Sequence, residues 1–236
     1  MKRRLVLGLI SLFLVMYGCG GGSGGLIGEG DKIPQPGGNC AYINGSYICL
    51  KSFEPFYYDY EKYKNANVDI FRSICEDTST SGGGDGNSTT TRPEYFGDHS
   101  FMLEIETRGM TGYRQVPDFL IYPVSYTIDY IVSPDSFEAP AIEKYYGGLP
   151  SVSLRSSVED SSVKVSGVFF DVARKIKAYQ DLQTMRHGNP AIPSNYVAYV
   201  KFNMQTSDGK KFELSTVVGL SIGNYDYCAI GKETEG

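Results

Sequence analysis

Apolar residues occupy every second position along one stretch of this chain, and this spacing constrains the fold more than any other feature. Successive side chains of a β-strand point to opposite faces, so a period of two indicates a strand with one buried face. The stretch comprises Leu120, Tyr122, Val124, Tyr126, Ile128, Tyr130 and Val132. It is longer than an ordinary strand, and we expect Pro123 to mark an edge or a bend within it.

Shorter runs of the same kind predict further strands. Phe101, Leu103 and Ile105 alternate with two glutamates, which is typical of a half-buried strand. Other strands are expected at 152–154, 163–172, 196–205 and 211–222. The last two flank a turn at Asp208-Gly209, a dipeptide that favours a β-hairpin.

One helix is expected among these strands. Residues 173–178 favour helix, Asp171 is a suitable N-terminal cap and Gly188 a suitable stop. The 28 glycines and 19 tyrosines, with no tryptophan, favour turns and strands. The predicted fold class is therefore mainly β, a two-sheet immunoglobulin-like or fibronectin-III-like sandwich with one short crossover helix.

Two cysteines bracket a hairpin signature. Cys40 and Cys49 enclose Asn44-Gly45, which favours a type I′ turn. Counting outward from this turn places Cys40 opposite Cys49 in a non-hydrogen-bonded pair, where facing Cα atoms are about 4.5 Å apart. That distance is within reach of a disulfide.

The amino terminus resembles the signal peptide of a bacterial lipoprotein. Three basic residues precede an apolar run from Leu5 to Tyr17, and Gly18-Cys19 follows. The run is shorter than the roughly 20 apolar residues that span a bilayer, although an uncleaved amino-terminal anchor is the alternative. The resemblance implies cleavage before Cys19 and acylation of this residue, palmitate being the expected type of chain. It also implies a lipid-anchored protein of the bacterial cell envelope, at the outer membrane because Gly20 follows Cys19.

The count of cysteines agrees with this assignment. The chain has five, and assigning Cys19 to lipid leaves an even number, which in an exported protein suggests two disulfides. With Cys40 joined to Cys49, Cys75 pairs with Cys228 by elimination. The rival is a metal site, but no C-x-x-C pair exists and only two histidines are present. We therefore predict no metal and no cofactor.

The predicted organisation has six parts. They are a signal peptide over 1–18, a lipidated Gly-rich tether over 19–39, a disulfide hairpin with an aromatic segment over 40–77, a flexible loop over 78–95, the β-sandwich domain over 96–228 and a tail over 229–236. Within the aromatic segment, residues 59–75 fit either a helix or a strand. From about 163 to 222 the order of strand, basic helix and Asp-Gly hairpin resembles uncharacterised bacterial surface lipoproteins with such domains, a resemblance that implies no activity.

Charge and motifs argue against several classes of function. The formal net charge is −5 and becomes −8 once the three basic residues of the leader are removed, which disfavours nucleic acid as a partner. Ser221 lies in a G-x-S-x-G pattern, but within a strand, and both His99 and His187 precede it, unlike the nucleophile of α/β-hydrolases. Glu104 and Glu106 fit a solvated strand face better than a glycosidase pair. No catalytic residue is predicted.

The tyrosines are the candidate binding residues. Exposed tyrosine rings stack on sugars or form protein interfaces. The positions in question are Tyr57, Tyr58, Tyr60, Tyr63, Tyr145 and Tyr146. The alternative is that these rings pack in the core. We expect a non-catalytic structural, adhesive or protein-binding role toward another envelope protein; a carbohydrate-binding module that recognises a glycan is the second hypothesis and an envelope hydrolase a distant third.

Overall fold

A computed structural model describes residues 38–80, 87–109, 118–136, 138–156, 161–186, 192–225, 227, 228 and 230. All of them belong to one compact unit, Ile33–Gly236. The strands are β1 (Cys40–Ile43), β2 (Ser46–Tyr57), β3 (Asn67–Asp69), β4 (Ile74–Thr80), β5 (Asn87–Pro93), β6 (His99–Gly109), β7 (Phe119–Val132), β8 (Tyr145–Gly148), β9 (Leu154–Ser156), β10 (Ser161–Phe170), β11 (Ser194–Thr206) and β12 (Lys211–Gly223). The helix α1 (Val172–Met185) lies between β10 and β11.

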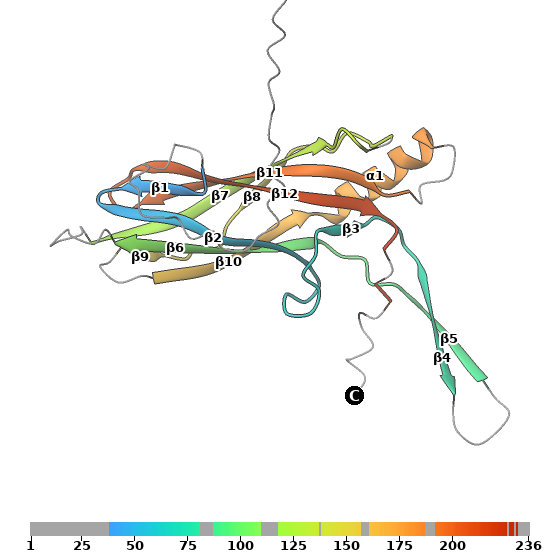
Figure 1. Cartoon of the computed structure of the whole chain (residues 1–236). Helices are drawn as coiled ribbons and strands as arrows, with labels where there is room; N and C mark the ends of the chain where they lie inside the picture. Colours follow the sequence, from blue (N-terminus) through green and yellow to red (C-terminus); the bar gives the residue numbers. More distant parts are fainter. Residues whose placement is uncertain are drawn as a thin grey trace, which may run out of the picture. The chain divides into compact units, whose positions relative to one another are not determined.

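Two sheets form the layers of a sandwich (Figure 1). Sheet A has the order β1-β2-β6-β10, and sheet B has the order β3-β12-β11-β7-β8, with β9 also paired to β7. All pairs are antiparallel except that of β3 with β12. β4 and β5 form a separate ribbon that projects beyond the two layers (Figure 1). The predicted fold class, a mainly β two-sheet sandwich with one helix, is confirmed for the described part of the chain.

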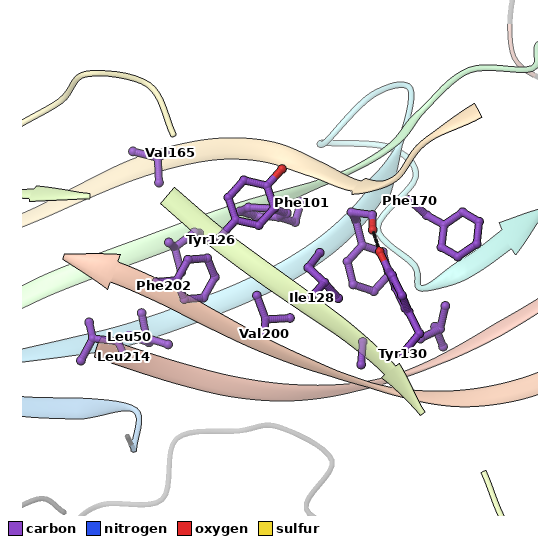
Figure 2. Close-up of a cluster of buried hydrophobic side chains, with 14 of the residues drawn as sticks. Leu50, Phe101, Tyr126, Ile128, Tyr130, Val165, Phe170, Val200, Phe202 and Leu214 are labelled. Atoms are coloured by element: carbon purple, nitrogen blue, oxygen red, sulfur yellow. Dashed lines mark hydrogen bonds between the residues drawn. The ribbon is translucent and has the colours of Figure 1, made fainter. Parts of the chain in front are cut away.

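The core lies between the two sheets. Phe101 of β6 packs against Tyr126 of β7 and Phe202 of β11, with ring centroids 4.9 and 5.9 Å apart. Figure 2 shows these rings side by side, with side chains from both layers pointing toward one another. The other labelled members of this cluster are Leu50, Ile128, Tyr130, Val165, Phe170, Val200 and Leu214, all buried. Burial of this apolar surface is the main force that holds the sheets together.

The long alternating run forms a single strand, β7, with a change of face inside it. The pairing of β7 with β11 shifts register at Pro123–Ser125, opposite Asn203 and Met204. After this β-bulge Tyr126, Ile128 and Tyr130 point into the core, as predicted. Before it the buried residues are those at 119, 121 and 123, so the expectation that one face carries the whole row is wrong.

The local signals in the sequence are confirmed. The Asp171 side chain caps α1 by accepting from the amide of Arg174 at 2.8 Å. Asn44 and Gly45 have φ of 50° and 89°, as a type I′ turn requires, and Gly209 has φ of 87° in the second hairpin turn. The predicted stop at Gly188 lies outside the described residues.

Both predicted disulfides are present. Cys40 faces Cys49 in the register of β1 with β2, and the two sulfur atoms are 2.07 Å apart. Cys75 is joined to Cys228, which ties the base of the β4–β5 ribbon to the carboxyl-terminal segment. The Arg92 guanidinium adds to this link by donating to the carbonyl of Ile230 at 3.0 Å.

The secondary structure of two segments, 78–95 and 59–75, remained to be compared with the sequence-based expectations. The range 78–95, expected to be a flexible loop, contains the last three residues of β4 and all of β5. These strands pair because β-branched threonines suit a β-ribbon and the disulfide at Cys75 anchors its base. The undecided segment over 59–75 has no helix; it contains β3 and the start of β4.

Candidate functional site

The outer face of sheet B carries a group of apolar side chains, three of them exposed and Val197 half-buried, that we call the outer patch. Ile131 lies on β7, Val197 and Tyr199 on β11 and Val217 on β12. Val197 is opposite Ile131, and Tyr199 is opposite Val217 two residues further along β11. Facing side chains on one side of a sheet are about 4.5–5.5 Å apart at Cβ, so the four residues are contiguous. Ile131, Tyr199 and Val217 are 53%, 44% and 56% exposed.

Tyr146 of β8 extends this surface by one strand. Its side chain is 71% exposed, compared with 47% for Tyr58 and 44% for Tyr199. The Lys144 ammonium lies 5.9 Å from the centroid of its ring and forms an ion pair with Asp129 at 2.7 Å. Because Asp129 is the neighbour of Tyr199 across β7 and β11, this ion pair lies between Tyr146 and the outer patch.

The same face is hollowed beside the β7 bulge. The hollow measures about 520 Å³. Its lining includes Val124, Asn203, Gln205, Lys211 and Glu213. Met204 and Phe212 also line it, so the face offers a hollow of mixed polar and apolar lining at one end and an apolar patch toward the other.

The outer face of sheet A has a different character. On this face Lys51 pairs with Glu104 at 2.8 Å and Arg108 pairs with Glu106 at 2.5 Å. The two glutamates that resembled a glycosidase pair are thus members of surface ion pairs. Charged and polar side chains on this sheet contrast with the aliphatic patch on the other.

The predicted tyrosine cluster that follows Phe56 has one buried ring, two half-buried rings and one exposed ring. Tyr57 is fully buried and donates to the carbonyl of Tyr95 at 2.7 Å. Tyr57 forms a small apolar cluster with Tyr227 and Ile230, against which Tyr63 packs. Tyr60 packs on Phe56 and donates a hydrogen bond to Glu54. Of these four tyrosines only Tyr58 is exposed, at 47%.

The second predicted pair is divided between the two faces of β8. Tyr145 packs toward the core, with its ring centroid 5.7 Å from that of Tyr126 and the Arg174 guanidinium 4.8 Å from its own centroid. Tyr146 points the other way, into solvent. The pair therefore contributes one ring to the core and one to the surface.

A buried group of ionisable side chains lies where α1 meets the sandwich. Lys175 of α1 has no exposed surface, and its Nζ lies 4.2 Å from the ring centroid of Tyr57 and 5.1 Å from that of Phe96. Asp69 at the end of β3 is also fully buried, and Glu94 after β5 is 6% exposed. We call Lys175, Asp69 and Glu94 the buried triad.

The triad has unused hydrogen-bonding capacity. Within the described part of the chain, Lys175 Nζ, Asp69 Oδ2 and Glu94 Oε2 have no hydrogen-bond partner. The other oxygens are held: Asp69 Oδ1 accepts from the amides of Phe71 and Tyr225 at 3.1 and 3.2 Å. Glu94 Oε1 accepts from the amide of Tyr227 at 2.5 Å. Buried polar atoms usually have partners, so these three atoms are exceptions to the rule.

Burial shifts the titration of this region toward neutral forms. It lowers the pKa of Lys175 to about 8, against the opposing effect of the Asp69 carboxylate. It raises the pKa of Asp69 to about 6, against the two amides that donate to it. His99, which stacks on Tyr57, has its pKa lowered to about 4 by burial.

Sequence reasoning did not find the triad. A lysine on a helix is normally exposed. The helical spacing of Lys175 with Ala178 and Leu182 could have indicated its burial. These three residues fall on one face of α1, and all three are buried.

The hydrolase motif has no support in the geometry. Ser221 lies within β12, opposite Asn195 of β11. His99 is buried in β6, where its Nε2 donates to the carbonyl of Asn65 at 2.8 Å. His187 lies outside the described residues.

Three further observations bear on function. Over the described ranges no three His, Cys, Asp or Glu side chains group to hold a metal ion. The helix in this part of the chain is neither long nor apolar enough to cross a membrane. Comparison with protein-family models, with curated proteins and with solved structures finds no match.

Proposed function

We propose that this chain is a lipid-anchored protein of the bacterial cell envelope, held at the outer membrane by acyl chains on Cys19, and that it binds another envelope protein through the outer patch. Its role is structural or adhesive and non-catalytic, and the sandwich is of immunoglobulin-like form. The proposal of a lipid anchor rests on the amino-terminal sequence. Each methylene of an acyl chain that enters the membrane adds about 0.8 kcal/mol of membrane affinity.

The outer patch is the observation that supports the proposed binding of another envelope protein. Exposed contiguous apolar surface is unfavourable in water by about 25 cal/mol per Å², and such patches mark interaction sites. Ile131, Val197 and Val217 present only aliphatic groups, which offer no hydrogen bonds to the hydroxyls of a sugar. An apolar protein surface is therefore the better complement to this patch.

A glycan is the second candidate ligand, and Tyr146 is the observation that favours it. Its exposed ring has the charged side chains of Lys144 and Asp129 beside it. A ring flanked by hydrogen-bonding groups suits a sugar, which has an apolar face and a polar rim.

Replacement of Cys19 by Ala tests the anchor. We expect the wild-type protein in the membrane fraction as a processed, acylated form, and the C19A protein either soluble or unprocessed. A processed C19A protein that stays in the membrane fraction would contradict lipid anchoring.

Substitutions on the two outer faces test the binding surface. Val217→Lys places a charge in the outer patch, and Ser166→Lys places one at an exposed position on β10 of sheet A as a control. In crosslinked envelopes we expect one partner protein with the wild type and S166K, and its loss with V217K. Retention by V217K would contradict the proposal, whereas glycan-array binding that Tyr146→Ala abolishes would favour the second candidate.

A further inference from the structure

A groove beside α1 combines aromatic walls with an arginine. It measures about 380 Å³ and is bordered by the helix and by the segments that follow β3 and β5. Its lining includes Phe71, Arg72, Phe96, Tyr179, Gln180 and Gln183. We propose that this groove, which we call the helix groove, binds a small aromatic carboxylate whose carboxylate group contacts the Arg72 guanidinium. The site is independent of the outer patch and of the lipid anchor.

The size and the walls of the helix groove suit a small molecule. Small-molecule sites measure about 300–1,000 Å³ and combine mostly apolar walls with a few polar groups. Here the rings of Phe71, Phe96 and Tyr179 all line the groove. Those of Phe71 and Tyr179 meet edge to face, with centroids 5.1 Å apart and an interplanar angle of 78°. Such rings present both edges and faces to a ligand, so a flat aromatic group complements them better than a branched aliphatic one.

Arg72 supplies the charge that an anionic ligand needs. Its guanidinium carbon lies 4.9 Å from the centroid of the Phe96 ring, a contact that holds the planar group against one wall. Stacking uses the face of the guanidinium group and leaves the N–H groups at its edge to donate. Arg72 forms no ion pair with any residue that the structure describes. A carboxylate is the planar anion that matches this fork of donors.

The nearby ionisable groups leave Arg72 as the charge that a ligand can reach. Lys175 Nζ lies 5.1 Å from the centroid of the same Phe96 ring, but this lysine has no exposed surface. Asp69 and Glu94 are buried, and each accepts a hydrogen bond from a backbone amide of the carboxyl-terminal segment. No acidic side chain is among the described residues that line the groove. An anion in the groove therefore meets a cation and no facing carboxylate.

Two glutamines on α1 add hydrogen-bonding groups to the same wall. Gln180 and Gln183 follow Ile176 and Tyr179 at helical spacing, so the four side chains lie on one side of the helix. Gln183 Nε2 donates to the Tyr179 hydroxyl at 2.5 Å, which leaves Oε1 of this glutamine to accept from a ligand. An aromatic acid that also carries a hydroxyl or amide substituent would use these groups.

Isothermal titration calorimetry of the full-length protein in detergent tests the site with three probes. 2-Naphthoate has an aromatic ring system and a charge, 2-naphthamide has the ring system alone, and cyclohexanecarboxylate has the charge alone. We expect saturable one-to-one binding of 2-naphthoate and at least about tenfold weaker binding of each of the others. Absence of saturable 2-naphthoate binding would overturn the proposal. Equal affinity for 2-naphthamide would overturn the role of the charge, and equal affinity for cyclohexanecarboxylate would overturn that of the rings.

Three variants locate the binding. Arg72→Met removes the cation from the groove, and Lys201→Met removes an exposed cation from β11 as a control. We expect R72M to weaken 2-naphthoate binding at least about tenfold and K201M to change it less than about twofold. Ile176→Glu places a carboxylate at a groove position that is 37% exposed, and it should weaken binding as R72M does. An R72M or I176E protein that is folded by circular dichroism and binds 2-naphthoate like the wild type would overturn this site.

Discussion

The Tyr126 hydroxyl binds both backbone polar groups of Val168. It donates to the carbonyl oxygen and accepts from the amide nitrogen, each at 2.8 Å. Tyr126 belongs to β7 of sheet B, whereas Val168 belongs to β10 at the edge of sheet A. The register of β10 with β6 shifts just after Val168. One side chain thus joins the two layers where the edge pairing becomes irregular.

Removal of this hydroxyl should destabilise the fold. Tyr126→Phe leaves the amide and the carbonyl of Val168 without their side-chain partner, and each buried polar group without a partner costs about 1–3 kcal/mol. We expect a loss of at least about 1 kcal/mol in the free energy of unfolding, measured by urea titration. Tyr199→Phe, at an exposed position, is the control and should change stability by less than about 0.5 kcal/mol. Equal effects of the two changes would contradict the bridge.

Gly167, next to Val168, should not accept a side chain. A Cβ atom there would lie 2.6 Å from Cζ of Phe101 and 3.0 Å from the Tyr126 hydroxyl oxygen. Because the Phe101 ring is fully buried, Gly167→Ala should cost about 1–3 kcal/mol of stability. Gly219→Ala is the matched control, since no atom lies within 4 Å of its added Cβ. Thermal unfolding of both variants distinguishes overpacking from a general effect of losing a strand glycine.

His99 should make the fold sensitive to acid. Its folded-state pKa of about 4 is below the ordinary value of 6.5, so its neutral form is favoured in the native state. Above pH 6.5 the full stability is present; as the pH falls through 6.5 toward 4, the unfolded chain binds a proton that the native protein does not, and stability is lost. The loss is about 3 kcal/mol at most.

The raised pKa of Asp69 acts in the opposite direction over part of this range, because its native state prefers the protonated form. The measurement is therefore the difference between the wild type and His99→Gln in unfolding free energy at pH 7 and at pH 4.5. We expect a smaller decrease in the variant. An identical decrease in both proteins would contradict the assignment to His99.

The two disulfides should differ in their contributions. Cys75 and Cys228 are 153 positions apart, whereas Cys40 and Cys49 are 9 apart. In the chain-entropy model these loops correspond to about 5 and about 2.5 kcal/mol. We expect replacement of the Cys75–Cys228 pair by alanines to lower the unfolding midpoint in urea more than replacement of the Cys40–Cys49 pair. The reverse order would show that local strain or residual structure dominates.

Features set by neighbours in the sequence could be predicted, and features set by distant contacts could not. The turn at Asn44-Gly45 and the cap at Asp171 follow from backbone preferences of single residues. Pro123 was expected to mark an edge or a bend but not a change of face, because the change of face depends on pairing with β11. The β4–β5 ribbon was missed because its strands are rich in small polar residues and glycines lie between them in the sequence, a composition that is also typical of a loop.

The candidate sites show the same division. Tyr146 was among the predicted binding residues, but nothing local distinguishes it from Tyr145, which turns to the opposite face of β8. The outer patch draws on three strands, so its members are not adjacent in sequence. Lys175 has the composition of a solvated helix face, and only the packing of α1 against Tyr57 and Phe96 buries it.

Site-specific photo-crosslinking in intact cells tests whether the outer patch binds another envelope protein. A photoreactive amino acid replaces Tyr199 in the outer patch or, in the control, Ser166 on the outer face of sheet A. We expect a cross-link to one envelope protein from position 199, its loss when Val217→Lys is added, and none from position 166. Equal cross-linking from the two faces, or none from position 199 in cells where the protein is membrane-bound, would contradict the proposed binding.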